Sequence, residues 1–360
     1  MKRGYRTLAV LAVFALAAAA CGEEPKPAAP STAQNANFLA CQVTDTGGID
    51  DRSFNATAWK GMQDAKTELG VQVKVLESSS QNDFAPNLQA FVQQKCGLIV
   101  TVGFLLGDAT KASAKQNASQ KYAIVDFAYE PKDVPNNNVL GLTFSTDQAA
   151  FQAGYVAAAV SKTHKVGTFG GINLPTVTIF MDGFWAGIQY YNQQKNASVQ
   201  LLGWNPAKPK AGLFTGDFTN QDNGKRVTET LLGEGADIIL PVAGPVGLGA
   251  AAAVKAAGGD NRMIWVDTDG CVSAAQFCSL FLTSIQKNMD VAVATAVKDA
   301  VNGQFKGGST YVGTLANNGV AIAPFHELDS QVPQSVKDEL NTIKQGIVDG
   351  SISVKPSDYQ

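Results

Sequence analysis

Short apolar runs alternate with longer segments of mixed polarity along most of the chain. Nine runs have the length and composition of buried strands: FLACQV, VQVKVLE, GLIVTV, YAIVDF, KVGTFG, VQLLGW, ADIILPV, MIWVDT and LFLTSI. Many of the segments between them have helical periodicity. In the first such segment, Ala58, Met62, Ala65 and Leu69 recur at helical spacing, and Gly70 predicts the end of the helix. This alternation predicts βαβ units and parallel sheets.

The chain is long enough for two domains. Its 360 residues exceed what a single hydrophobic core usually fills, and its composition, 45% hydrophobic and 16% charged, is that of a globular protein. The halves 38–145 and 146–268 show the same coarse succession of strands and helices. We therefore expect an α/β protein with two similar lobes.

The residues that directly follow the predicted strands are candidates for a ligand site. In open parallel sheets, ligands bind beyond the carboxyl ends of the strands, where loops lead into helices. The residues in these places are Asp45, Gly103, Asp126, Gly170, Gly171, Gly244, Asp267 and Lys287. An alternative role for Asp126 and Asp267 is to cap helices.

The stretch VTDTGGIDDRSFN, residues 43–55, follows the first predicted strand. A solvated turn would explain its glycines and aspartates, but it would not require Phe54. A packed turn would not favour three acidic residues, Asp45, Asp50 and Asp51. The mixture is therefore more typical of a binding site than of a connector.

The N-terminus has the pattern of a targeting segment. Basic residues precede an apolar run from Leu8 to Ala20, which is too short to span a bilayer and predicts a signal peptide over residues 1–20. The run ends in AAAC, which resembles a bacterial lipobox and predicts lipidation of Cys21; the alternative is an ordinary secretory cleavage site. Residues 21–37 are polar and rich in Pro and Ala, as in a tether. We expect the folded part to begin near Phe38, outside the cytoplasm.

The remaining cysteines are consistent with an oxidising compartment. Besides Cys21, the chain has Cys41, Cys96, Cys271 and Cys278, an even number that permits three pairings. We favour Cys41 with Cys96, because each lies near the start of a predicted strand. The other pair, Cys271 with Cys278, would then close a short loop.

The sequence lacks the usual signatures of catalytic and metal sites. It has only two histidines, His164 and His326, and no G-x-S-x-G, H-E-x-x-H, C-x-x-C or G-x-x-x-x-G-K-[ST] motif. The run GPVGLG from Gly244 has the wrong spacing for a dinucleotide loop, and the EF-hand pattern is absent around Asp45, so we expect no cofactor and no metal. Without residues 1–20 the chain loses three of 28 basic and none of 31 acidic residues, for a net charge of −6. Nucleic acid is therefore a poor partner.

Five motifs together resemble the basic membrane protein and purine nucleoside receptor lipoproteins, which are substrate-binding components of ABC importers. The motifs are D-x-G-G-I-D-D-R-S-F-N from Asp45, V-x-x-F-x-x-G-F-x-A-G-I from Val177, V-A-G-P-V-G from Val242, W-V-D-T-D-G from Trp265 and T-S-I-Q-K from Thr283. Each motif alone is weak, whereas together they are specific and cover almost all of the chain after the N-terminal segment.

The resemblance implies a type I periplasmic-binding-protein-like fold, in which a hinge joins two doubly wound parallel-sheet lobes around a nucleoside. We expect the N-terminal lobe to comprise residues 38–145 and 269–308. The C-terminal lobe is then expected to comprise residues 146–268 and 309–360. Ligand binding would close the two lobes about the hinge.

For the base, the resemblance implies stacking between Phe54 and Phe180, one from each lobe, with Asp45 and Asn55 at its polar edge. Aromatic stacking contributes about 1–3 kcal/mol and tolerates any base, while an asparagine amide can pair with a donor–acceptor edge such as that of a purine. An alternative role for Phe54 is ordinary core packing, because it lies one turn before Ala58 on the apolar stripe.

For the ribose, the resemblance implies contacts from Asp126, Asp267 and Lys287 and from the backbone at Gly244. Carboxylates around a cleft accept hydrogen bonds from hydroxyl groups and repel a phosphate, so a nucleoside suits the site better than a nucleotide. Lys287 would offset part of the repulsion among the carboxylates.

These observations predict a non-enzymatic receptor, lipid-anchored to the extracytoplasmic face of the cell membrane, that delivers a nucleoside to an ABC permease and its ATPase. Two alternatives remain open. One is a nucleosidase that uses an aspartate as its base, for which histidine partners are lacking. The other is a ligand sensor that acts on a membrane partner without transport.

Overall fold

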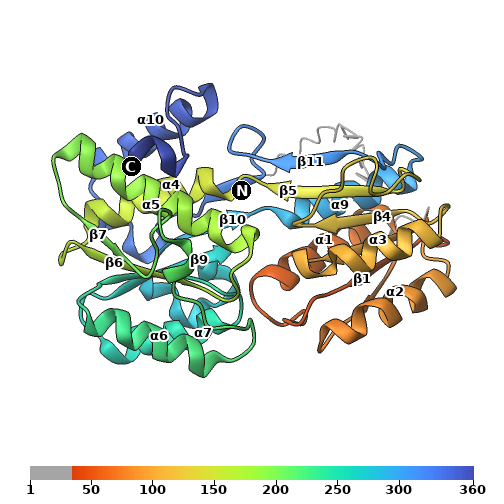
Figure 1. Cartoon of the computed structure of the whole chain (residues 1–360), viewed down its shortest axis with the longest axis horizontal. Helices are drawn as coiled ribbons and strands as arrows, with labels where there is room; N and C mark the ends of the chain where they lie inside the picture. The colour runs from red at the N-terminus through yellow and green to blue at the C-terminus, as the bar shows by residue number, and fades with distance from the viewer. Residues whose placement is uncertain (1–34) are drawn as a thin grey trace, which may run out of the picture. The chain divides into compact units, whose positions relative to one another are not determined.

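The computed structural model describes residues 35–360, which form two six-stranded β-sheets flanked by helices (Figure 1). The expected signal peptide (1–20), the lipidation site Cys21 and most of the expected tether (21–37) lie outside the described residues. Among the helices of residues 35–360, none combines the length and apolarity needed to cross a membrane.

The first sheet is parallel throughout. Its strands in spatial order are β11 (Thr310–Gly313), β5 (Val139–Phe144), β4 (Tyr122–Val125), β3 (Leu98–Val102), β1 (Leu39–Val43) and β2 (Gln72–Leu76). One face is covered by α1 (Phe54–Leu69) and α9 (Met289–Val301), and the other by α2 (Phe84–Gln93) and α3 (Gly107–Gln116). Successive residues of β1 pack on opposite faces, Ala40 in one core and Cys41 in the other. Burial of both faces explains why the central strands are apolar runs without alternation.

The second sheet is parallel except for β12, which is antiparallel to β10. Its strands in spatial order are β12 (Val320–Ile322), β10 (Phe281–Lys287), β9 (Arg262–Asp267), β8 (Ile238–Val242), β6 (Lys165–Gly170) and β7 (Gln200–Leu202). Its helices are α4 (Thr146–Val160) and α5 (Pro175–Lys195) on one face, α6 (Gln221–Gly233) and α7 (Val246–Ala257) on the other, and α10 (Gln334–Asp349) against α4. The two sheets confirm the predicted α/β class.

Short helical turns lie in the connections. They are η1 (Gln81–Asp83), η2 (Phe104–Leu106), η3 (Pro209–Ala211), α8 (Gly270–Ser273), η4 (Ala275–Leu280), η5 (His326–Gln331) and η6 (Pro356–Tyr359). Two of them, α8 and η4, fill the connection from β9 to β10, where the other parallel crossovers of this sheet use a long helix.

The predicted strands and first helix are confirmed within residues 35–360. Each of the nine apolar runs overlaps one observed strand, whereas β5, β11 and β12 were not predicted. Helix α1 ends as expected at Gly70, which has a φ of 70° and donates its N–H to the carbonyl of Lys66. A residue in this left-handed conformation is a common helix terminator.

Within the described residues, the chain passes between the two lobes three times. It crosses at Ser145 between β5 and α4, at Asn288 between β10 and α9, and over residues 314–319 between β11 and β12. The expected boundary at residue 145 agrees with the first crossing.

The sheet topology differs from the expected boundaries in two places. Residues 269–308 were expected in the N-terminal lobe, but β10 within this range pairs with β9 of the second sheet. Residues 309–360 were expected in the C-terminal lobe, but β11 pairs with β5 of the first sheet. The first difference arises from the β9–β10 connection. No long amphipathic helix follows β9, so the sequence gives no sign that the next strand still belongs to the second lobe.

Two disulfide bonds join the cysteines in the favoured pairing. Cys41 of β1 bonds to Cys96, which precedes β3, at a separation of 55 residues. Cys271 bonds to Cys278 at a separation of seven residues and closes the β9–β10 connection. The first bond therefore closes a long loop within one lobe, and the second fixes a short loop beside Asp267.

The two disulfides should differ in their contribution to stability. A chain-entropy estimate gives about 4 kcal/mol for the long loop and about 2.5 kcal/mol for the short one. We predict that the double variant Cys41→Ser/Cys96→Ser loses more free energy of unfolding than Cys271→Ser/Cys278→Ser. Chemical denaturation without reductant measures both losses. Unchanged stability in both double variants would contradict the pairing.

Candidate ligand-binding site

The candidate site is a cavity of about 590 Å³, including its open side, at the carboxyl ends of strands from both sheets. Its walls come from the loops after β1, β3, β4 and β8, from the ends of β9 and β10, from the β7–α6 loop and from the starts of α1 and α5. The residues that the sequence predicts to bind ligand all line this cavity: Asp45, Phe54, Asn55, Asp126, Phe180, Gly244, Asp267 and Lys287.

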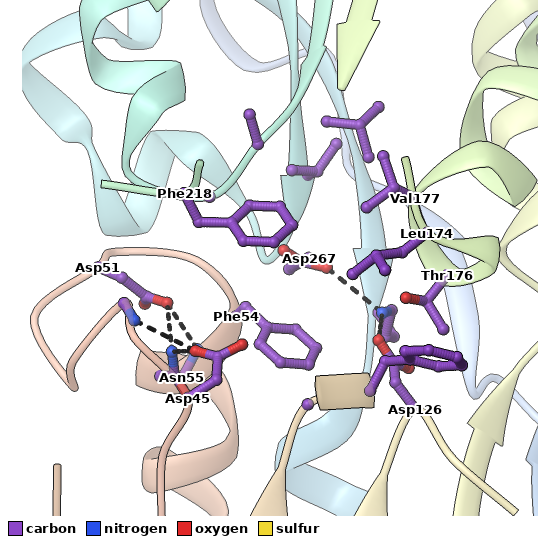
Figure 2. A pocket seen from close by; sticks show the side chains of 18 of the residues that line it. Asp45, Asp51, Phe54, Asn55, Asp126, Leu174, Thr176, Val177, Phe218 and Asp267 are labelled. Atoms are coloured by element: carbon purple, nitrogen blue, oxygen red, sulfur yellow. Dashed lines mark hydrogen bonds and ion pairs between the residues drawn. The ribbon is translucent and has the colours of Figure 1, made fainter. Parts of the chain in front are cut away.

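Asp126 and Asp267 occupy matching places in the two lobes. Asp126 directly follows β4, and Asp267 is the last residue of β9. Their φ angles are 65° and 70°, in the left-handed region that few non-glycine residues adopt. Such backbone strain persists only where the surrounding structure holds it, and it recurs at functional sites. Both side chains border the cavity (Figure 2).

The ammonium of Lys287 lies between these carboxylates. Lys287 is the last residue of β10, and only 2% of it is exposed. Its Nζ lies 2.7 Å from Asp126 Oδ2 and 3.8 Å from Asp267 Oδ1. The ring centroids of Phe54 and Phe180 lie 4.9 and 5.3 Å from the same nitrogen, within range of cation–π attraction. Carboxylates from both lobes and two aromatic faces therefore hold the ammonium in place.

Asp45 and Asn55 form a hydrogen-bonded pair at another side of the cavity (Figure 2). Asn55 Nδ2 donates to Asp45 Oδ1 at 2.7 Å, and the Gly47 N–H donates to the same oxygen at 3.2 Å. Asn55 Oδ1 is buried and receives no hydrogen bond from the described residues. The pair therefore has acceptor capacity that a ligand N–H group can use.

Asp51 fixes the start of α1, which carries Phe54 and Asn55. Its carboxylate accepts the N–H groups of Ser53 at 3.0 Å, Asn55 at 2.7 Å and Ala56 at 2.9 Å. A carboxylate at a helix N-terminus satisfies N–H groups that have no partner within the helix and interacts favourably with the helix dipole. Asp51 thus has a capping role that the sequence pattern did not reveal.

Burial changes the acidity of the carboxyl groups. Removal from water raises the pKa of Asp45, raises that of Asp51 to about 7, and raises that of Asp267. The side chain of Asn55 lowers the pKa of Asp45 in part, and Lys287 does the same for Asp267. Additional hydrogen-bond donors at these oxygens would stabilise the charged form of each group further.

Two glycines keep space for the site. Gly103, directly after β3, has a φ of 117°, and a Cβ atom there would lie 2.7 Å from Asp45 Oδ2. Gly244, after β8, has a φ of 54° and no atom within 4 Å of an added Cβ. Gly103 therefore allows Asp45 to occupy its position, and the backbone at Gly244 faces open space in the cavity wall.

Two aromatic residues face each other across the cavity, and one of them was not predicted. Phe54 and Phe218 lie on opposite sides of the space in Figure 2. Phe180, expected to cover the second face of a base, also lines the cavity; it is 2% exposed, and its ring lies beside Lys287. Phe218 stands alone in the polar stretch TGDFTNQD, as Phe54 does in DDRSFN. That isolated aromatic position is the signal that could have identified it.

One group of potential metal ligands occurs within residues 35–360. Asp269, Cys271 and His326 have ligand atoms within 4.8 Å of one another. The sulfur of Cys271 is bonded to Cys278 and so is not a thiolate, the form of cysteine that binds metals. His326 Nε2 lies 2.7 Å from Asp269 Oδ2, which is an ordinary contact between a histidine and a carboxylate and requires no metal.

The two-sheet fold and the cavity between its lobes are of the type I periplasmic-binding-protein-like kind, which binds a small solute between two lobes. In structure, the chain is similar to an ABC transporter solute-binding protein from Aeropyrum pernix K1, with a TM-score of 0.76 and 26% sequence identity. The match covers 88% of this chain and 92% of that chain.

The chain belongs to the family of PnrA-like ABC transporter substrate-binding proteins, whose family model matches residues 38–358. It is 28% identical to the ABC transporter nucleoside-binding protein BmpA of Lactococcus lactis subsp. cremoris, with 98% of this chain and 99% of the relative covered. It is 30% identical to basic membrane protein A of Borreliella burgdorferi, with 86% and 85% covered. The predicted family and its non-enzymatic, substrate-binding role are confirmed.

Proposed function

We propose that the protein is a lipid-anchored receptor on the extracytoplasmic face of the cell membrane, which captures a purine nucleoside and delivers it to an ABC permease and its ATPase. One observation carries the proposal: Asp126 and Asp267 flank Lys287 in the same cavity that Phe54 and Phe218 border. The similarity to the nucleoside-binding protein of Lactococcus supports the choice of ligand class.

The carboxylates of Asp126 and Asp267 are placed to accept hydrogen bonds from ribose hydroxyls. Each lies at the carboxyl end of a parallel strand, where such folds bind their ligands. Lys287 orients both groups, since its ammonium lies close to an oxygen of each. Two acceptors from opposite lobes suit the vicinal hydroxyls of a ribose.

The base is placed between Phe54 and Phe218, with its polar edge toward Asp45 and Asn55. Phe54 begins α1 of the first lobe and Phe218 precedes α6 of the second, so the two rings enclose a planar ligand from both lobes. The free acceptor of Asn55 and the carboxylate of Asp45 favour an edge with N–H donors, as guanine and hypoxanthine have.

The charge of the cavity favours nucleosides over nucleotides. Among the described residues that line it, the carboxyl groups of Asp45, Asp51, Asp126 and Asp267 accompany a single ammonium, that of Lys287. A phosphate would approach several carboxylates and find its one potential cation already paired. In a cavity that holds little water, the negative charges of a phosphate and a nearby carboxylate repel each other more strongly than they do in water.

Attachment to the membrane is proposed to occur through Cys21. A single acyl chain anchors a protein only marginally, so at least two chains are expected. We predict that Cys21→Ser leaves the membrane fraction in the native host, while the wild-type protein remains in it. Fractionation followed by immunoblotting measures this. Equal recovery of both proteins in the membrane fraction would contradict the anchor.

Asp267 is predicted to distinguish a nucleoside from its free base. Each hydrogen bond from a ribose hydroxyl to a buried carboxylate contributes about 1.5–3 kcal/mol, so Asp267→Ala should weaken guanosine binding at least about tenfold. Guanine binding should change little, because Phe54, Phe218, Asp45 and Asn55 remain. Calorimetric titration with both ligands measures the difference.

Asp269 provides a matched control for this experiment. It lies two residues away, accepts the N–H of Cys271 and contacts His326, and it does not line the cavity. Asp269→Ala should therefore leave guanosine binding nearly unchanged. Equal losses for guanosine and guanine in Asp267→Ala, or a larger loss in Asp269→Ala, would place the ribose elsewhere.

Phe218 is predicted to stack on the base. Loss of one stacked ring costs about 1–3 kcal/mol, so Phe218→Ala should raise the Kd for both guanosine and guanine by about 5- to 150-fold. Phe214→Ala is the control: Phe214 lies four residues earlier and packs against Trp204 outside the cavity lining. Titration of both variants decides the matter, and equal effects would argue against a stacking role.

A further inference from the structure

We infer that Ser53 is a positioning residue that joins the two lobes and holds Asp267 for the ligand. Ser53 belongs to the first lobe, directly before α1, and none of it is exposed. Its Oγ lies 2.7 Å from Asp267 Oδ2 and 3.1 Å from the carbonyl oxygen of Val266, both in β9 of the second sheet. Ser53 does not line the cavity. The inference deepens the proposed function and rests on it for the identity of the ligand.

The hydroxyl of Ser53 is free for this contact because another residue caps the helix. Ser53 occupies the N-cap position of α1, where a serine usually accepts an N–H from its own helix. It makes no such bond among the described residues. Asp51 accepts the N–H groups of Ser53, Asn55 and Ala56 instead. The sequence Asp-Arg-Ser thus separates two roles, since the aspartate caps the helix and the serine reaches across the cleft.

Neighbouring contacts cross between the lobes at the same place. Arg52 Nη1 donates to the carbonyl of Ser273 at 3.1 Å, and Trp265 Nε1 donates to the carbonyl of Arg52 at 3.3 Å. Arg52 itself is exposed, with a φ of 57°. The contact of Ser53 is the buried member of this group, so water competes with it least.

Besides the ion pair of Lys287 with Asp126, the carboxylate of Asp267 links lobe closure to the ligand site. Lys287 approaches Oδ1 of Asp267, and Ser53 donates toward Oδ2. Lys287 belongs to the same sheet as Asp267, whereas Ser53 comes from the other lobe. The bond from Ser53 therefore forms only when the lobes approach each other. It orients Asp267 in the closed form and must break before the lobes separate, so its main effect should be on ligand release.

The test compares the kinetics of guanosine binding in wild type and Ser53→Ala by stopped-flow fluorescence. We expect the dissociation rate to rise about tenfold, as for a hydrogen bond to a charged group, and the association rate to stay within about twofold. In an Asp267→Ala background, Ser53→Ala should add less than it does alone, because one of its two acceptors is gone. A dissociation rate of Ser53→Ala within about twofold of wild type would overturn the inference.

A matched control separates this role from the loss of any buried hydroxyl. Thr110 is also fully buried, and its hydroxyl donates to Thr101 at 2.9 Å inside the first lobe. Thr110→Val should leave the dissociation rate of guanosine unchanged. Chemical denaturation shows whether either variant is destabilised, and equal acceleration of release in both would assign Ser53 a general structural role instead.

Scattering distinguishes failure of the inference from failure of the proposed function. If wild-type protein binds no guanosine by calorimetry, the nucleoside assignment is wrong, but the contact between Ser53 and β9 still predicts a closed form that Ser53→Ala weakens. Small-angle X-ray scattering without ligand should then give a larger radius of gyration for Ser53→Ala than for wild type and Thr110→Val. In that case, equal radii for the three proteins would overturn the role of Ser53.

Discussion

The arrangement of the site depends on the buried ammonium of Lys287. An unpaired charge at such a position costs several kcal/mol, so carboxylates must remain beside it. One of them, Asp126, directly follows β4 of the first sheet, and the other, Asp267, ends β9 of the second. Lys287 is also the last residue before the chain crosses at Asn288 to α9. Lys287 therefore connects two features of the structure, the point where the chain crosses between the lobes and the geometry of the candidate ligand site.

The loop from Asp45 to Asn55 shows why a binding protein needs such a mixture of residues at the end of a strand. Asp51 caps α1, which frees the hydroxyl of Ser53 to reach the second lobe. Phe54 then begins the helix with its ring toward Lys287, and Asn55 orients Asp45. The loop is therefore not a simple solvated turn. Its polar residues are not interchangeable, because each satisfies a different hydrogen-bonding or packing requirement.

The sequence was informative about those parts of the structure that local pattern determines. Buried parallel strands are apolar runs, so β1 and β8 were recognisable, and residues at their carboxyl ends were candidates by geometry alone. The short β12 has no such pattern, because it is an edge strand defined by its pairing with β10. Other features depend on how the two lobes meet, which no local sequence pattern encodes. Examples are the positions of Phe218 and Phe54 on opposite sides of the cavity and the contact between Ser53 and Asp267.

The distribution of charge between the lobes gives a physical reason for closure to depend on ligand. The first lobe contributes Asp45 and Asp126 to the cavity, and the second contributes Asp267 together with Lys287. Bringing the lobes together pairs the ammonium with Asp126 but also removes carboxylates from water, which raises the pKa of Asp45 and of Asp267. Hydroxyl and N–H groups of a bound ligand replace part of the lost hydration, so they lower the free energy of the closed form more than that of the open one. Under the proposed function, we therefore expect a neutral ligand rich in donors to favour closure, and a phosphate, which brings further negative charge, to oppose it.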